Sequence, residues 1–109
     1  MGYGINNEFV ACIQACQSCV LDCEVCLAAM IGQDSSNDCP LCCYECVEIC
    51  LQCARALTRN SRFVKEYCGL CAKVCGWCAE QCAKHNMDHC QRCADSCLVC
   101  VEECRKIAL

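Results

Sequence analysis

Cysteines recur along the chain at the spacing of one helix face. In the stretch CIQACQSCVLDCEVC, residues 12–26, the thiols stand four, three, four and three residues apart. This alternation places side chains along a single face of an α-helix, where Leu, Ile and Val usually form the core seam. Thiolates are soft metal ligands. The stretch therefore predicts a helix that directs metal-binding groups into a protein core.

The same rhythm returns three more times, and of the 21 cysteines only Cys42 falls outside it. Spacing of 4-3-4-3 holds for the first two sets, and 3-4-3-4 for the last two. The four sets are Cys12, Cys16, Cys19, Cys23 and Cys26; Cys39, Cys43, Cys46, Cys50 and Cys53; Cys68, Cys71, Cys75, Cys78 and Cys82; and Cys90, Cys93, Cys97, Cys100 and Cys104.

Turn-forming residues separate the four sets. The segment IGQDSSNDCP is a loop whose Pro40 suits the first turn of a second helix. In LTRNSRF, Asn60 or Ser61 is suited to cap the third helix, and KHNMDHC turns near Asn86. Short connections join antiparallel neighbours, so the sequence predicts an all-α, up-down-up-down four-helix bundle with a cysteine-lined core. We expect one domain over residues 1–109, with helices of about 20 to 25 residues.

Antiparallel order stacks the cysteines into layers across the bundle. One end layer holds Cys12, Cys53, Cys68 and Cys104, and the opposite end layer holds Cys26, Cys39, Cys82 and Cys90. Cys is small where Leu is usual, and each methyl-sized void costs about 1 kcal/mol. We therefore expect metal ions to occupy the axis.

Charge favours Cu(I) as the metal. Each Zn(Cys)₄ layer would leave a charge of −2 in a buried tube without Lys or Arg, and buried uncompensated charge is costly. Cu(I) bridged by thiolates at near one-to-one stoichiometry is close to neutral, and a linear bond between two sulfurs suits an i, i+4 pair such as Cys12 and Cys16. A zinc-buffering or redox-buffering thiol bundle stays open as the alternative.

Other features narrow the class of protein. The net charge of −4 over 109 residues provides no basic patch for nucleic acid. No run of about 18 apolar residues occurs, which excludes a membrane-spanning helix. The odd number of cysteines and the absence of a signal-peptide pattern predict a reduced, cytoplasmic protein. Many equivalent thiols without a paired acid and base predict that the chain is not an enzyme.

The repeated CxxxC pairs, together with HNMDHC before the last cysteine helix, resemble the cytosolic copper storage proteins of bacteria. The resemblance implies that many Cu(I) ions bind in the bundle core, delivered by a copper donor such as a chaperone or a small thiol. It also implies a homotetramer in which CxxxC thiolates supply most bonds to copper. Cys42 offers a further CxxxC with Cys46 but lies off the seam. The implied pairs are Cys12/Cys16, Cys19/Cys23, Cys39/Cys43, Cys46/Cys50, Cys71/Cys75, Cys78/Cys82, Cys93/Cys97 and Cys100/Cys104.

The two ends of the predicted tube differ in chemistry. At one end, each helix contributes an apolar residue one turn beyond its cysteines, which predicts a hydrophobic plug of Phe9, Leu57, Val64 and Ile107. At the other end, thioether and imidazole groups able to bind Cu(I) predict an entrance for copper, with Asp34 and Asp38 across from them. These groups belong to Met30, His85, Met87 and His89.

Overall fold

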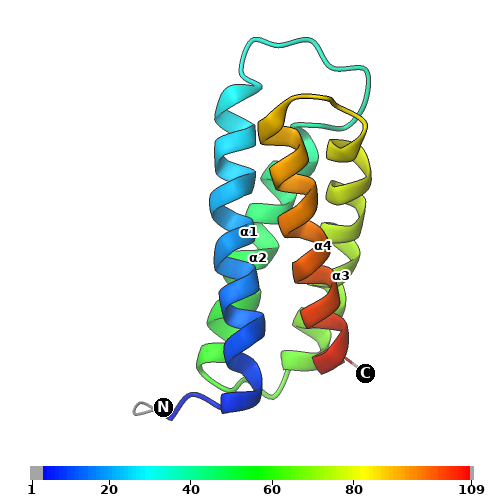
Figure 1. Cartoon of the computed structure of the whole chain (residues 1–109). Coiled ribbons are helices and arrows are strands. Elements are labelled where there is room, and N and C mark those ends of the chain that lie inside the picture. Colours follow the sequence, from blue (N-terminus) through cyan, green and yellow to red (C-terminus); the bar gives the residue numbers. More distant parts are fainter. Residues whose placement is uncertain (1–3, 109) are drawn as a thin grey trace.

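Four α-helices form an elongated antiparallel bundle in the computed structural model, which describes residues 4–108 (Figure 1). A short 3₁₀ turn, η1, precedes them, and the bundle measures 44 × 25 × 17 Å. The prediction of an all-α four-helix bundle is confirmed, with helices of 18 to 21 residues. The elements are η1 (Asn7–Phe9), α1 (Val10–Ala29), α2 (Leu41–Thr58), α3 (Val64–Ala83) and α4 (Asp88–Ala108).

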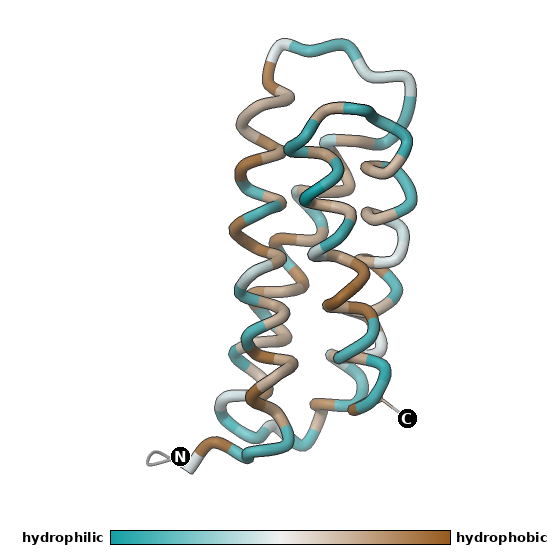
Figure 2. Tube along the Cα trace, viewed as in Figure 1, coloured by the Kyte–Doolittle hydropathy of each residue, from teal (hydrophilic) through white to brown (hydrophobic). Residues whose placement is uncertain are grey.

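Each helix packs against two neighbours, so that α1 and α3 lie on one diagonal of the bundle and α2 and α4 on the other. The loop from α1 to α2 is the longest connection and passes over one end of the bundle beside the α3–α4 turn (Figure 1). Both described termini lie at the opposite end. The hydrophilic residues concentrate in the loops and on outward-facing helix positions (Figure 2).

The turn between α2 and α3 differs in detail from the predicted cap. Asn60 has a φ of 53°, in the left-handed region that Asn tolerates where a helix ends. Ser61 Oγ accepts a hydrogen bond of 3.1 Å from the backbone N–H of Phe63, the residue before α3. Ser61 therefore supports the start of α3 from two residues before the N-cap position. Pro40 similarly stands at the N-cap of α2, one residue earlier than expected.

The core consists mainly of cysteine. All 21 cysteines are buried, and none exposes more than 1% of its surface. Apolar side chains such as Ile13, Val47 and Val101 flank the thiols. Within residues 4–108 no polar or charged side chain is buried. The interior of the described residues therefore offers no cationic side chain that could balance a negative charge on the sulfur atoms.

Length and composition alone do not exclude a membrane-spanning helix, contrary to the expectation from the sequence. The helical segment Asn7–Ala29 is long and apolar enough to cross a membrane by length and composition. Cysteine counts as apolar on the hydropathy scale, and five cysteines of this segment raise its mean value. Buried core helices pass the same test. In the bundle, these cysteines are buried, and α1 packs against α2 and α4.

Candidate metal centre

Thiols from all four helices contact one another along the bundle axis. The Sγ atoms lie 3.2 Å apart for Cys46 and Cys75, 3.3 Å for Cys23 and Cys93, and 3.5 Å for Cys19 and Cys97. All are free thiols. Two sulfurs on one tetrahedral Zn²⁺ stand about 3.8 Å apart, given a metal–sulfur bond of about 2.3 Å. The thiols therefore already stand close to metal-ligand spacing.

Several groups of four thiols have all their sulfur atoms within 4.8 Å of one another. Neighbouring groups share members, as Cys19 and Cys46 belong to two groups and Cys43 and Cys93 to two others. Shared thiolates favour bridged metal clusters over separate tetrahedral ions. The groups include Cys16, Cys71, Cys100 and Cys104; Cys19, Cys46, Cys50 and Cys75; Cys19, Cys23, Cys46 and Cys97; Cys23, Cys43, Cys78 and Cys93; and Cys26, Cys43, Cys82 and Cys93.

The predicted CxxxC pairs divide into two kinds. In five of them the two sulfurs lie 3.8–3.9 Å apart on one helix, namely Cys19/Cys23, Cys46/Cys50, Cys71/Cys75, Cys78/Cys82 and Cys100/Cys104. The other three pairs are Cys12/Cys16, Cys39/Cys43 and Cys93/Cys97. In these, the thiols contact thiols on other elements and not each other. Cys12 lies 3.5 Å from Cys104, and Cys82 lies 3.8 Å from Cys39. Both kinds of contact are suited to bridging by metal.

Cys42 joins this network although it lies off the predicted seam. Its side chain is fully buried, and its Sγ lies 3.8 Å from Cys82 Sγ and 4.0 Å from the Cys78 carbonyl oxygen. Cys42 occupies the flank of α2 that faces α3. Heptad spacing describes a single face, so it did not reveal a thiol directed toward a neighbouring helix.

Hydrogen bonds between thiols separate their pKa values. The Cys104 thiol bonds to Cys12 and lowers its pKa to about 5. Bonds from Cys43 and Cys82 lower the pKa of Cys26 to about 6. Burial raises the pKa of Cys39 to about 11. At neutral pH the core therefore contains both thiolates, which bind metal directly, and thiols, which must first lose a proton.

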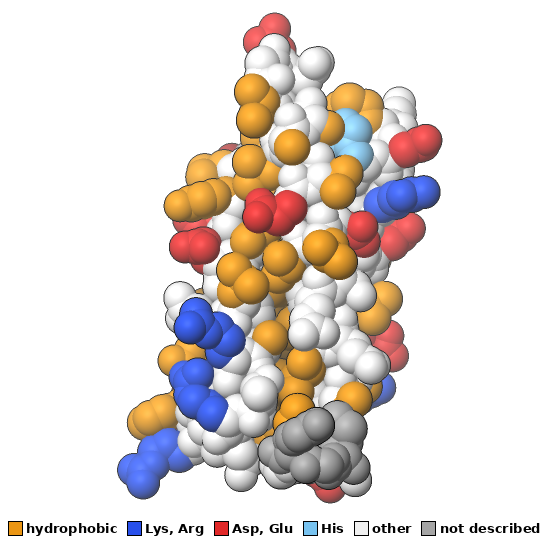
Figure 3. Space-filling view, turned by 90° about the vertical axis from the view of Figure 1, so that its left-hand side faces the viewer, with side chains coloured by type: hydrophobic (Ala, Val, Ile, Leu, Met, Phe, Trp, Pro, Cys, Tyr) orange, Lys and Arg blue, Asp and Glu red, His pale blue; other side chains and the backbone are white. Residues whose placement is uncertain are grey.

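We call the end of the bundle beside the α1–α2 loop the mouth. Here His89 Nδ1 lies 3.4 Å from Cys26 Sγ and 3.4 Å from Cys90 Sγ, so this imidazole reaches the outermost thiols. Met30 is 2% exposed and packs into the core, whereas Met87 is 38% exposed. A histidine side chain is visible at the surface near this end (Figure 3).

His85 lies at the same end of the bundle, and its imidazole contacts the α1–α2 loop. Its Nε2 lies 2.8 Å from Asn37 Oδ1, and this oxygen also accepts a bond of 3.0 Å from the Cys39 backbone N–H. Asn37 Nδ2 donates to the Gln81 carbonyl oxygen at 2.9 Å. The structure therefore brings His85 to the α1–α2 loop, where it helps fasten that loop to the end of α3.

The opposite end is closed by apolar side chains, as predicted. Leu57 is fully buried and Phe9 is 8% exposed. Val64 and Ile107 are partly buried and pack against the same core. This plug contains one residue from each of the three helices α2, α3 and α4, together with Phe9 of η1.

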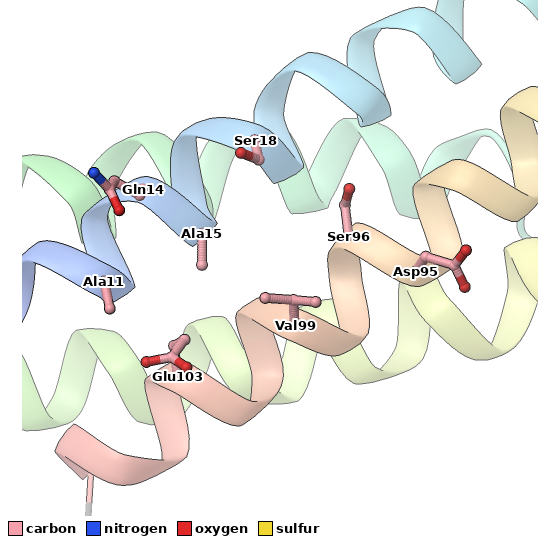
Figure 4. A pocket seen from close by; sticks show the side chains of 8 residues that line it. All are labelled: Ala11, Gln14, Ala15, Ser18, Asp95, Ser96, Val99 and Glu103. Carbon is pink, nitrogen blue, oxygen red and sulfur yellow. The ribbon is translucent and has the colours of Figure 1, made fainter.

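A surface groove among the described residues offers no comparable set of ligands. A groove between α1 and α4 is lined by small and polar side chains and contains no thiol (Figure 4). Ser96 donates to Asp22 beside it. The residues that line the groove are Ala11, Gln14, Ala15, Ser18, Asp95, Ser96, Val99 and Glu103. The thiols, in contrast, are all interior.

Fold and site together define a class of protein: a four-helix bundle whose core is a continuous network of metal-binding thiols. The sequence model of the copper storage protein family matches residues 5–109, and the chain belongs to this family.

Two solved structures and one curated sequence are similar to this chain. The Cu(I)-bound copper storage protein BsCsp3 matches with a TM-score of 0.90 and 37% identity over 94% of this chain and 100% of that one. The copper storage protein Ccsp from Streptomyces lividans, loaded with 10 copper equivalents, matches with a TM-score of 0.86 and 26% identity, covering 97% of this chain and 88% of that one. The uncharacterized cysteine-rich protein YhjQ of Bacillus subtilis (strain 168) is 39% identical over 82 residues, which is 72% of this chain and 76% of that protein.

Proposed function

We propose that this chain stores copper by holding many Cu(I) ions on the thiolates of its core. The observation that carries this proposal is the continuous sulfur network, in which groups of four thiols share members along the bundle. Membership of the copper storage protein family and the likeness to a Cu(I)-bound relative support it.

Electrostatics favours Cu(I) in this interior. Each thiolate carries one negative charge, and each Cu(I) carries one positive charge, so bridged clusters near one-to-one stoichiometry are close to neutral. No cationic side chain is buried among residues 4–108 to balance an excess of thiolate. The neutral cluster avoids the cost of burying uncompensated charge.

The mouth is the proposed entrance for copper. His89 contacts the outermost thiols, and the Met30 thioether lies buried beside the same layer. Met87 is partly exposed and suits a first contact with an incoming donor, either a chaperone or a small thiol. Copper would pass from exchangeable ligands at the surface to the CxxxC thiolates inside.

A cytoplasmic location and a homotetramer complete the proposal. Free thiols in such number suit a reducing compartment. Exposed apolar side chains on α1 and α2 supply a surface for contact between copies, among them Leu21 at 67% and Tyr44 at 54% exposure. The role is storage, and no catalytic step is assigned to the thiols.

A Cu(I) titration tests the proposal. Reduced, metal-free protein is titrated without oxygen against a competing Cu(I) chelator of known affinity. We expect saturation to approach one copper per thiol, with protons released as thiols are engaged. Saturation after only a few equivalents would contradict storage and favour a trafficking role.

A further inference from the structure

The core discriminates between metal ions by their charge. A divalent ion held by four thiolates leaves a net charge of −2, and within residues 4–108 no buried side chain compensates it. Bridging Cu(I) removes the charge, because neighbouring ions share thiolates. A divalent ion is therefore better placed where one ligand is neutral and where the site is close to solvent.

The mouth has such a set of ligands. Cys26 Sγ and Cys90 Sγ lie 3.7 Å apart, and His89 Nδ1 lies 3.4 Å from each. These three atoms form a closed triangle. Cys39 Sγ lies 4.0 Å from Cys26 Sγ and supplies a fourth donor from the start of α2. Three donors thus converge from α1 and α4, and the thiol of Cys39, two residues before α2, lies beside one of them.

The three distances among Cys26, Cys90 and His89, and the distance from Cys26 to Cys39, match the edges of a tetrahedral zinc site. Bonds of about 2.3 Å to sulfur and about 2.0 Å to nitrogen give edges of about 3.8 Å between sulfurs and about 3.5 Å between nitrogen and sulfur. The observed sulfur–sulfur distances of 3.7 and 4.0 Å, and the nitrogen–sulfur distances of 3.4 Å, lie close to these edges. Three cysteines and one histidine are also a common ligand set for structural zinc.

We propose that the mouth binds one divalent ion of the zinc type through Cys26, Cys39, Cys90 and His89, at the edge of the Cu(I)-binding core, with which this site shares Cys26. Three thiolates and a neutral imidazole leave a charge of −1 around Zn²⁺ and −2 around a single Cu(I). The preference is therefore the reverse of that in the core. His89 is only half-buried, so solvent reduces the cost of the remaining charge.

Co²⁺ is the probe for this site, because tetrahedral Co²⁺ has visible ligand-field bands and a thiolate charge-transfer band. Reduced, metal-free full-length protein is titrated with Co²⁺ without oxygen, and Zn²⁺ is then added. We expect the first equivalent to give a tetrahedral spectrum that one equivalent of Zn²⁺ removes. His89→Ala should weaken the first equivalent by at least about tenfold, since loss of even an outer-shell partner costs 10–100-fold in metal affinity.

Two further variants show which donors take part. Cys39→Ser should lower the charge-transfer intensity of the first equivalent by about one third, because two thiolates remain of three. Cys53→Ser removes a thiol at the plug end and should leave the first equivalent unchanged. His85→Ala is the matched histidine control, because its imidazole contacts Asn37 and not the thiols. Far-UV circular dichroism checks that each variant keeps its helices.

The outcomes separate this proposal from copper storage. If the first equivalent of Co²⁺ binds to His89→Ala with the same affinity and spectrum as to the wild-type protein, the proposed divalent site is wrong. It is also wrong if Cys53→Ser loses the binding of that first equivalent. The Cu(I) capacity of the same variants is measured in parallel. A mouth that fails to bind Co²⁺ leaves a high Cu(I) capacity intact, whereas a low Cu(I) capacity refutes storage whatever Co²⁺ does.

Discussion

The position of each cysteine along the chain decides whether its thiol reaches the core, and the thiol group itself decides what the core can bind. The alternating spacing placed four sets of five thiols in the core, and every member is buried. The spacing did not place Cys42, whose burial depends on how closely α2 approaches α3. It also did not identify Asn37 as the partner of His85, because the path of a loop has no periodicity. Periodic positions were predictable, and contacts between elements were not.

Cys42 should contribute to capacity. Its Sγ lies 3.8 Å from Cys82 Sγ, so an additional bridging thiolate is available at the mouth end of the core. Replacing Cys42 with Ala should lower the Cu(I) content at saturation by about one ion, at near one-to-one stoichiometry. The control is Tyr44→Ala, a neighbour on α2 that is 54% exposed. An unchanged capacity in the Cys42 variant would show that this thiol is only a packing residue.

The pKa values predict which thiols release protons on loading. At about pH 7.5, Cys39, with a pKa of about 11, is protonated, whereas Cys26, with a pKa of about 6, is a thiolate. Metal binding therefore expels a proton from Cys39 and almost none from Cys26. Cys39→Ser should reduce the protons released at saturation by about one, and Cys26→Ser should leave them nearly unchanged.

A pH-indicator dye in weakly buffered solution measures this release. The direction of each pKa shift also predicts how the affinity for metal depends on pH. Between the two pKa values, metal binding at Cys39 competes with one proton and weakens about tenfold for each unit that the pH falls. At Cys26, protons compete with the metal only near and below pH 6. Equal proton release from the two variants would contradict the assignment.

The helices and their ends determine whether the bundle can exist without metal. The turn signals predicted all three connections, although Pro40 and Ser61 act one or two residues away from their expected positions. Helix boundaries depend on caps that compete locally, so they are harder to predict than the helices themselves. The apolar plug closes one end and contributes packing that the small cysteine side chains cannot provide.

Leu57 is the residue whose truncation tests the plug. It is fully buried, so Leu57→Ala should lower the free energy of unfolding of the metal-free protein by about 2–5 kcal/mol. Urea denaturation of the reduced protein measures the change. Leu70→Ala, at a helix position that is 52% exposed, should change stability by less than about 0.5 kcal/mol. Equal effects of the two substitutions would exclude a closing role for the plug.

The molecule as a whole is polarised along its axis. Asp34, Asp38 and Asp88 are exposed at the mouth. Basic side chains gather toward the opposite end on the face shown in Figure 3. The plug end carries Arg55, Arg59, Arg62, Lys65, Arg105 and Lys106, all of them exposed. Glu8, Glu66, Glu102 and Glu103 offset part of this positive charge, and Lys84 offsets part of the negative charge at the mouth. The remaining difference makes the mouth the more favourable end for an approaching cation.

This polarity predicts that copper enters from one end. A variant with Met30→Leu, Met87→Leu and His89→Ala removes the exchangeable ligands of the mouth, while Met-to-Leu changes nearly conserve volume. Transfer of Cu(I) from a chelator, followed by stopped flow, should slow by about tenfold, which corresponds to a barrier about 1.4 kcal/mol higher. Capacity at equilibrium should fall little, because the core thiolates hold most of the metal. Val64→Ala at the plug should leave the rate unchanged. A variant that loads at the normal rate but binds less copper would show that the mouth residues are storage ligands, and that copper does not depend on them to enter.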